Sequence, residues 1–138
     1  MPFSVEFRVR YAETDQMGVV HHSIYYVWFE HFRTEYFIEI GFPYSDLEKD
    51  GIFFPVVESG CKYISSATYD GMVKVSGCFE SPKGVRVRLN YIVEQSGKKI
   101  AEGYTLHAAL SKNGMPSRIP KELFSVLDTE ASSKSFGL

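Results

Sequence analysis

Three side chains that could carry out chemistry lie in one short loop, ahead of a long apolar segment. Asp15 comes first, and His21 and His22 directly precede the apolar segment. A carboxylate near the positive N-terminal end of a helix stays ionised at neutral pH, which makes Asp15 a weak general base but an available nucleophile. A structural role is also open at this stage, because an aspartate at such a position often caps a loop or a helix.

The same three side chains could in principle hold a metal ion, since carboxylates and imidazoles are good zinc ligands. However, only Asp15, His21 and His22 are candidate ligands, and all three stand in one short loop. We therefore expect no metal site in this loop.

A long helix is predicted to begin after Ser23 and to end before Gly41. Ser23 is a typical N-cap residue, Gly41 suits the first position after a helix, and Pro43 cannot continue one. The apolar residues of the segment are Ile24, Trp28 and Phe32 in one row, Tyr25, Phe29, Tyr36 and Ile40 in a second, and Val27, Phe37 and Ile38 outside both rows. Polar residues such as Arg33 are scattered, and a helix that is apolar on most of its circumference belongs in a core. We therefore expect other elements to enclose it.

Alternation of apolar and polar residues predicts a run of strands around this helix. The predicted strands cover residues 3–11, 53–67 with a bend at Gly60, 72–81, 85–95 and 99–110. Residues 42–52 are predicted to form a turn or a short helix, and residues 121–127 a short closing helix. The sequence thus predicts an α+β fold in one domain over residues 1–127, followed by a flexible tail over 128–138. Free edges of such a sheet favour pairing with a second subunit.

Composition argues against several other classes of protein. The chain has 138 residues and a formal net charge of −2, and it lacks the dense basic face that nucleic-acid binding requires. No apolar run suits a signal peptide or a membrane span. Cys61 and Cys78 are far apart, as expected for free thiols in a reducing compartment. We therefore expect a cytoplasmic protein that neither binds nucleic acid nor inserts into a membrane.

The string ETDQMGVVHHSIY, from Glu13 to Tyr25, resembles the loop-to-helix signature of hotdog-fold acyl-CoA thioesterases. The similarity is to the 4-hydroxybenzoyl-CoA thioesterase and YbgC-type branch, and it extends over about the first 120 residues. This resemblance implies a hotdog fold, in which a curved antiparallel sheet wraps around one long central helix. It also implies a dimer with sites at the subunit interface, often paired into tetramers, and no metal or organic cofactor.

The resemblance assigns roles to four residues in and beside the loop. Asp15 would either attack the thioester carbonyl or activate water, and the backbone N–H of His22 would stabilise the oxyanion. Gly18 would let the loop turn with positive φ and allow the thioester to approach closely. The His22 ring would orient the water or Asp15, and Tyr11 matches a tyrosine of the YbgC branch. A structural histidine and a buried core tyrosine are the alternatives for these last two residues.

For the coenzyme A tail, Lys83 and Arg118 fall where the 4-hydroxybenzoyl branch places phosphate-binding side chains. Arg86 and Arg88 lie nearby on the polar face of their predicted strand. Cations are suited to this task because they pair with phosphate oxygens, although a single residue of this kind is more often a solvated strand residue.

The predicted function is hydrolysis of an acyl-CoA to a free acid and coenzyme A, with Asp15 as the essential carboxylate. The alternative is a non-catalytic hotdog protein that binds, and so senses, an acyl-CoA or an acyl carrier. Asp15 in its matching context favours the hydrolase. A hotdog dehydratase is disfavoured, because the sequence lacks the Pro-Gly-containing helix motif of that group.

Overall fold

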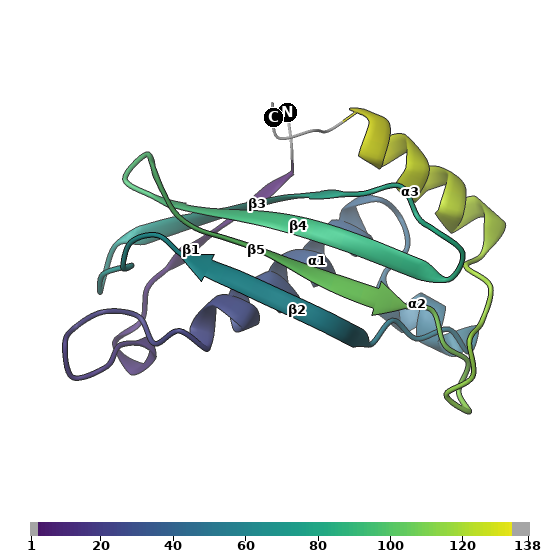
Figure 1. The fold of residues 1–138 in the computed structure, drawn as a ribbon, viewed down its shortest axis with the longest axis horizontal. Coiled ribbons are helices and arrows are strands. Elements are labelled where there is room, and N and C mark those ends of the chain that lie inside the picture. The colour runs from purple at the N-terminus through teal and green to yellow at the C-terminus, as the bar shows by residue number, and fades with distance from the viewer. Residues whose placement is uncertain (1–2, 134–138) are drawn as a thin grey trace.

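The computed structural model describes residues 3–133 of the chain. Its elements are β1 (Ser4–Arg8), the 3-10 turn η1 (Tyr11–Glu13), α1 (Ile24–Glu39), α2 (Tyr44–Lys49), β2 (Val56–Tyr63), β3 (Met72–Phe79), β4 (Arg86–Gln95), β5 (Lys98–Ala108) and α3 (Lys121–Ser133). The five strands form one antiparallel sheet in the order β1-β3-β4-β5-β2, and α1 runs along one face of it (Figure 1). The predicted α+β architecture with an antiparallel sheet is confirmed.

Two glycines of the sheet let aromatic rings of α1 lie directly against the strands. A Cβ atom on Gly77 would come within 2.5 Å of the Phe32 ring. A Cβ atom on Gly103 would come within 2.8 Å of the Phe29 ring, which also stacks on Tyr91 of β4 with ring centroids 4.1 Å apart. The two glycines therefore set how closely α1 approaches the sheet.

The C-terminal end of α1 follows the sequence prediction. Gly41 has a φ of +89°, its N–H donates to the Ile38 carbonyl oxygen at 3.0 Å, and the Phe42 N–H donates to the Phe37 carbonyl oxygen at 2.9 Å. This pair of bonds satisfies carbonyl groups that the helix leaves open, and it needs a residue that tolerates the left-handed conformation. The short helix predicted as one option within residues 42–52 is α2.

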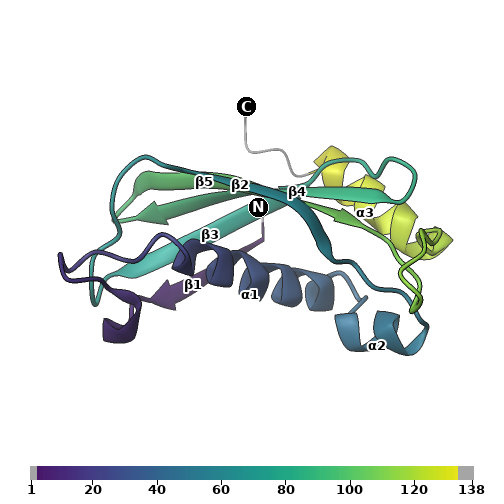
Figure 2. The same cartoon turned by 60° about the horizontal axis from the view of Figure 1, so that its bottom comes forward.

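The expectation that α1 is enclosed on nearly all sides is wrong within one chain. Val27 and Ile38 are about half exposed. Arg33, predicted to be one of the scattered polar residues of the helix, is buried. Figure 2 shows the sheet along only one side of α1, which leaves the apolar Val27 and Ile38 exposed on the helix. Arg33 can be buried because the hydroxyl of Tyr91, on β4, accepts a hydrogen bond from its guanidinium.

The edge strands are shorter than predicted. β1 ends at Arg8, and Tyr11 begins the 3-10 turn rather than ending a strand. β2 covers Val56–Tyr63 instead of residues 53–67, and its irregularity lies between Val56 and Glu58, not at Gly60. Gly60 pairs in register with Tyr104 of β5, so the pairing is not interrupted there.

The predicted boundary between closing helix and tail is also wrong. α3 continues through residues 128–133, while residues 134–138 of the predicted tail lie outside the described residues. β1 pairs with β3 only as far as Ser76, and α3 packs beside β3 (Figure 2). The extra turns are held by contacts distant in sequence, since the Tyr36 hydroxyl donates to Glu130 at 2.7 Å and Ser81 hydrogen-bonds Asp128.

Cys61 on β2 and Cys78 on β3 are both free thiols, as their separation in the sequence predicted. Cys78 is buried, and Cys61 is partly covered. None of the helices within residues 3–133 combines the length and the apolar character needed to cross a membrane.

Replacing Gly103 by alanine should destabilise the protein by about 1–3 kcal/mol, because the packed interior has no room for an added methyl group. The new Cβ would lie 2.8 Å from both the Gly60 carbonyl oxygen and the Phe29 ring. Urea unfolding followed by circular dichroism measures the change. Lys74→Ala, at an exposed position of β3, is the control, and it should stay within about 0.5 kcal/mol of wild type. Equal stability of Gly103→Ala and wild type would contradict this account of how α1 packs.

Candidate active site

Asp15 lies in a tight loop that its own carboxylate holds together. Its Oδ1 accepts hydrogen bonds from the N–H groups of Met17 and Val19, at 2.8 and 3.4 Å. The Asp15 N–H donates to the Val19 carbonyl oxygen at 2.8 Å. Gly18 has a φ of +77°, so the predicted turn with positive φ is confirmed. Asp15 Oδ2 accepts a hydrogen bond from no described residue, which leaves one carboxylate oxygen open to a ligand.

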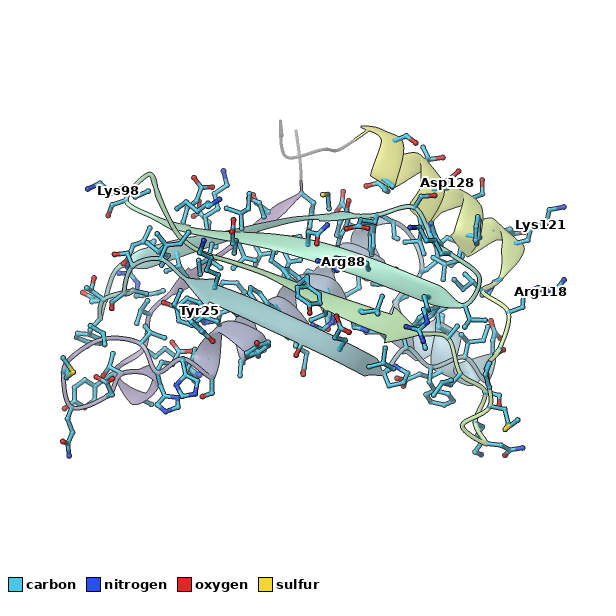
Figure 3. All side chains as sticks on the ribbon, viewed as in Figure 1. Tyr25, Arg88, Lys98, Arg118, Lys121 and Asp128 are labelled. Atoms are coloured by element: carbon cyan, nitrogen blue, oxygen red, sulfur yellow. The ribbon has the colours of Figure 1, made fainter. Side chains whose placement is uncertain are left out.

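Asp15 and His22 line a common hollow of about 320 Å³, termed the Asp15 hollow. The residues that line it are Asp15, Val20, His22, Tyr25, Tyr63, Ile64, Ser65 and Ser66. It lies between the N-terminal end of α1 and the exit of β2, at the end of the molecule where Figure 3 labels Tyr25. Two hydrogen bonds join these segments, from the Val20 N–H to the Ala67 carbonyl oxygen at 2.9 Å and from the Tyr63 hydroxyl to the His22 carbonyl oxygen at 3.0 Å.

The start of α1 leaves a backbone donor close to Asp15 in the sequence and beside the same hollow. The Ser23 N–H donates to His21 Nδ1 at 3.2 Å and the Ile24 N–H to the His21 carbonyl oxygen at 3.0 Å, but no described residue accepts a hydrogen bond from the His22 N–H. An open N–H at the positive end of a helix can bind an anion or a developing oxyanion. The His22 ring is exposed and stacks on His21, with centroids 4.3 Å apart.

The alternative of a buried Tyr11 and the prediction of Ser23 as a helix cap are both wrong. Tyr11 is 78% exposed, which rules out the alternative of a buried core tyrosine. Its ring meets Tyr69 edge-on at 5.6 Å and does not line the Asp15 hollow. Ser23 does not cap the helix through its side chain, because its backbone is already helical and its Oγ lies 2.8 Å from His21 Nδ1.

Sequence reasoning missed the part of the hollow that faces Asp15. Tyr63 ends β2, and Ser65 and Ser66 follow it; their place beside α1 depends on a hydrogen bond across 41 residues, from Tyr63 back to His22. The only signal was that the resemblance to the thioesterases extends over this part of the chain. Burial raises the pKa of Tyr63, so its phenol stays protonated and can donate hydrogen bonds.

The predicted phosphate-binding cations gather at the opposite end of the sheet. Lys83 and Arg86 close the turn between β3 and β4, with each N–H donating to the other residue's carbonyl oxygen at 3.0 Å. Hydrogen bonds from Ala109 to Val85 and from Ser117 to Ala109 bring Arg118 to the same end. Figure 3 labels Arg118 there, far from Tyr25. Within one chain, the structure therefore separates these cations from the Asp15 hollow by the length of α1.

Arg88 differs from these three arginine and lysine residues because its charge is already engaged. Its Nε lies 3.1 Å from a Glu80 carboxylate oxygen, and its guanidinium stacks over the Tyr104 ring at 3.9 Å from the centroid. Both partners reduce the capacity of Arg88 to hold a phosphate group.

A second hollow, of about 490 Å³, lies along the C-terminal half of α1 and is termed the Arg33 hollow. The residues that line it are Glu30, Arg33, Thr34, Tyr44, Glu48, Phe53, Phe54, Pro55, Leu110, Ser111, Lys112 and Gly114. Nothing in the local sequence predicted it, because α1, α2, the approach to β2 and the segment after β5 each supply one side.

A directed chain of hydrogen bonds anchors Arg33. Its Nη1 donates to the Tyr91 hydroxyl at 3.2 Å, which lies 2.6 Å from Thr105 Oγ1. The Thr105 oxygen lies 2.8 Å from His107 Nε2, and His107 Nδ1 lies 3.0 Å from the Phe54 carbonyl oxygen. A carbonyl oxygen only accepts, so Nδ1 carries the proton, Nε2 accepts from Thr105, and Thr105 accepts from Tyr91. Each hydrogen bond is therefore donated in the direction from Arg33 to Phe54, and His107 is neutral.

The free energy of unfolding should fall as the pH drops from 6.5 towards 4. Burial lowers the pKa of His107 from 6.5 to about 4, so in this window the unfolded chain binds a proton that the folded chain does not. The stabilisation is present above pH 6.5, and its loss amounts to about 3 kcal/mol at most. Urea unfolding at pH 7 and pH 4.5 measures the difference, which His107→Gln should reduce. The exposed His31, changed to Gln, serves as control and should leave the difference as in wild type. An unchanged difference in His107→Gln would contradict the assignment.

Comparison with known proteins identifies the family. Residues 9–127 match the thioesterase-like superfamily. YneP of Bacillus subtilis strain 168, provisionally named an acyl-CoA thioesterase, is 37% identical over 108 residues, which is 78% of each chain. The solved structure of protein TT1821 from Thermus thermophilus has a TM-score of 0.87 and 37% identity, covering 92% of this chain and 98% of that one. The DHNA-CoA thioesterase of Staphylococcus aureus has a TM-score of 0.86 and 31% identity, covering 91% and 88%. The chain therefore belongs to the thioesterase-like superfamily of hotdog proteins, as the resemblance in its Asp15 loop predicted.

Proposed function

We propose that the protein hydrolyses acyl-CoA thioesters to a free acid and coenzyme A at the Asp15 hollow. The observation that carries this proposal is the pairing of an open Asp15 carboxylate oxygen with an open His22 N–H along one hollow. Thioester hydrolysis needs a nucleophile or a base and a donor for the oxyanion, and this pair could supply both. The names of the relatives support the same activity.

Asp15 can act in either of two ways. In the first, Oδ2 attacks the thioester carbonyl carbon, coenzyme A leaves as the thiolate, and water then hydrolyses the acyl anhydride. In the second, the carboxylate takes a proton from a water molecule that attacks the same carbon. In both, the His22 N–H and the positive end of α1 stabilise the negative oxygen, a contribution of about 3 kcal/mol for one good donor. Neither path requires a metal or an organic cofactor.

We infer that the active form is at least a dimer that pairs through β2. Among the described strands, β2 bonds only to β5, so its other edge is open, and Val56, Val57 and Tyr63 are 42–50% exposed. Antiparallel pairing of two such edges about a two-fold axis sets the Tyr63 end of one β2 beside the Val56 end of the other. The two sheets would then form one continuous sheet that covers the α1 helices of both subunits, and each α1 would be enclosed more fully than in the single chain.

This arrangement accounts for the place of the cations. The Val56 end of β2 lies at the end of the sheet that carries Lys83, Arg86 and Arg118, because Val56 pairs with His107 and Arg86 with Ala108. In the dimer that end adjoins the Asp15 hollow of the partner subunit. We therefore propose that the coenzyme A phosphates bind to cations of one subunit while the thioester lies at Asp15 of the other.

Asp15→Asn should lower thiol release from acyl-CoA by about 10³-fold or more, because the amide keeps the shape and the loop acceptor but loses the charge. The assay compares acetyl-, butanoyl-, palmitoyl-, benzoyl- and 4-hydroxybenzoyl-CoA. Asp46→Asn on α2, remote from the hollow, is the matched control and should keep full activity. Binding of these thioesters by wild type without thiol release would favour the sensor, and undiminished activity of Asp15→Asn would remove Asp15 from catalysis.

Lys83→Met and Arg118→Met should raise KM more than they lower kcat, since the phosphates are remote from the reacting carbon and their binding energy is shared by substrate and transition state. Steady-state kinetics on the best substrate of the panel measures both constants. Lys98→Met, at the other end of β5, is the charge-matched control (Figure 3). A fall in kcat at constant KM would exclude Lys83 and Arg118 from phosphate binding.

A further inference from the structure

We propose that the Arg33 hollow of one subunit holds the acyl group of a thioester bound at Asp15 of the other subunit, and that Arg33 selects acyl groups with a hydroxyl at the far end. This inference rests on the proposed function and adds a residue that determines specificity. It starts from a buried charge that the single chain leaves incompletely satisfied.

Arg33 is about nine-tenths buried, yet no described carboxylate lies within 4 Å of its guanidinium. Its Nη1 donates to Tyr91, and the Tyr44 hydroxyl also interacts with the guanidinium, but its buried Nε–H has no hydrogen-bond acceptor in the described chain. A guanidinium carries five N–H donors, and leaving one of them without an acceptor in a buried site is costly. The chain of hydrogen bonds through Thr105 and His107 keeps this cation in one position. Because Arg33 also lines the hollow, an acceptor oxygen placed there would meet a positioned guanidinium.

The walls of the Arg33 hollow favour an apolar body. Phe53, Phe54, Pro55 and Leu110 supply apolar surface, and Tyr44 adds an aromatic ring. Such walls suit an aryl or branched acyl group, with a few polar groups fixing its orientation.

The charges around the Arg33 hollow favour a neutral group over a second carboxylate. Arg33 and Lys112 are balanced by Glu30 and Glu48, so the formal charge of the lining is zero. A carboxylate on the ligand would meet the guanidinium but also two acidic side chains. A hydroxyl can accept from Arg33 and at the same time donate to a carboxylate, so it matches both signs of charge.

The two hollows are too far apart to act together within one chain. From His22 to Arg33 the chain advances eleven residues along α1, or about 16 Å along the helix axis. Across the inferred β2 interface they become neighbours, because Phe54 and Pro55 of the Arg33 hollow directly precede Val56. The Val56 end of one β2 then lies beside the Tyr63 end of the other, where the Asp15 hollow opens.

The first test compares two substrates that differ by one oxygen, 4-hydroxybenzoyl-CoA and benzoyl-CoA. In wild type, kcat/KM should favour the hydroxylated substrate, and Arg33→Met should reduce this preference by about 10-fold or more, as expected for a lost hydrogen bond to a charged donor. Arg8→Met, at an exposed position of β1, is the matched control and should leave the preference unchanged. Glutaryl-CoA and pentanoyl-CoA form a second pair. An Arg33-dependent preference for the carboxylate pair alone would overturn the assignment to a hydroxyl.

If the enzyme is active but Arg33→Met leaves its preference for 4-hydroxybenzoyl-CoA unchanged, the role of Arg33 is overturned. Absence of thiol release from any of these substrates in wild type would instead refute the proposed function, and this inference with it. Circular dichroism of each variant establishes that it is folded. If Arg33→Met does not fold, Arg33→Lys retains the charge but loses the planar fork, and the same reduction in preference is expected of it.

The second test asks which subunit supplies the hollow. Chains carrying Asp15→Asn and chains carrying Arg33→Met are co-expressed with different affinity tags, and the mixed dimer is purified on both. One site of that dimer combines an intact Asp15 with the intact Arg33 of the partner subunit. The mixed dimer should therefore show the wild-type preference for the hydroxylated substrate. The preference of the Arg33→Met homodimer would show instead that Arg33 acts within its own chain and would overturn the shared site.

Discussion

The structure depends on the contact between the aromatic face of α1 and two strand positions that carry no side chain. Gly77 and Gly103 allow the rings of Phe32 and Phe29 to reach the backbone of the sheet, and Tyr91 then stacks on Phe29. Interiors packed this closely tolerate little displacement. The axis of α1 is therefore fixed relative to the strands, and so are the two ends of the helix, where both hollows lie.

The polar groups at the two ends of α1 differ in how they are bonded. At the N-terminal end the chain leaves polar groups open, namely the His22 N–H and one oxygen of Asp15, in a loop that is otherwise closed by its own hydrogen bonds. At the other end the polar groups are buried and connected, from Arg33 to Phe54. Open groups suit a reacting centre, which must form new bonds. A connected and rigid set suits recognition of a substituent, which must be held in one orientation.

Much of the fold was accessible from the sequence because its signals are local. The helical spacing of aromatic residues, Gly41 at the helix end, and the alternation in the strands each depend on neighbours within a few positions. The loop with Asp15 and Gly18 was found in the same way, aided by resemblance. The failures concern groups whose environment comes from distant segments. Arg33 could be placed in the interior only by knowing that Tyr91, 58 residues away, lies above it. The length of α3 depends on Glu130 meeting Tyr36 across 94 residues.

The open edge of β2 also has a consequence for how the protein behaves on dilution. A free strand edge with exposed Val56 and Val57 presents unpaired backbone groups to any chain that can extend the sheet. If that edge is covered by a second copy, the folded state and the assembled state are thermodynamically linked, and the midpoint of thermal unfolding rises with protein concentration. Dilution then uncovers β2 and separates the two halves of the shared site at once, so that activity per chain and resistance to heat decline together.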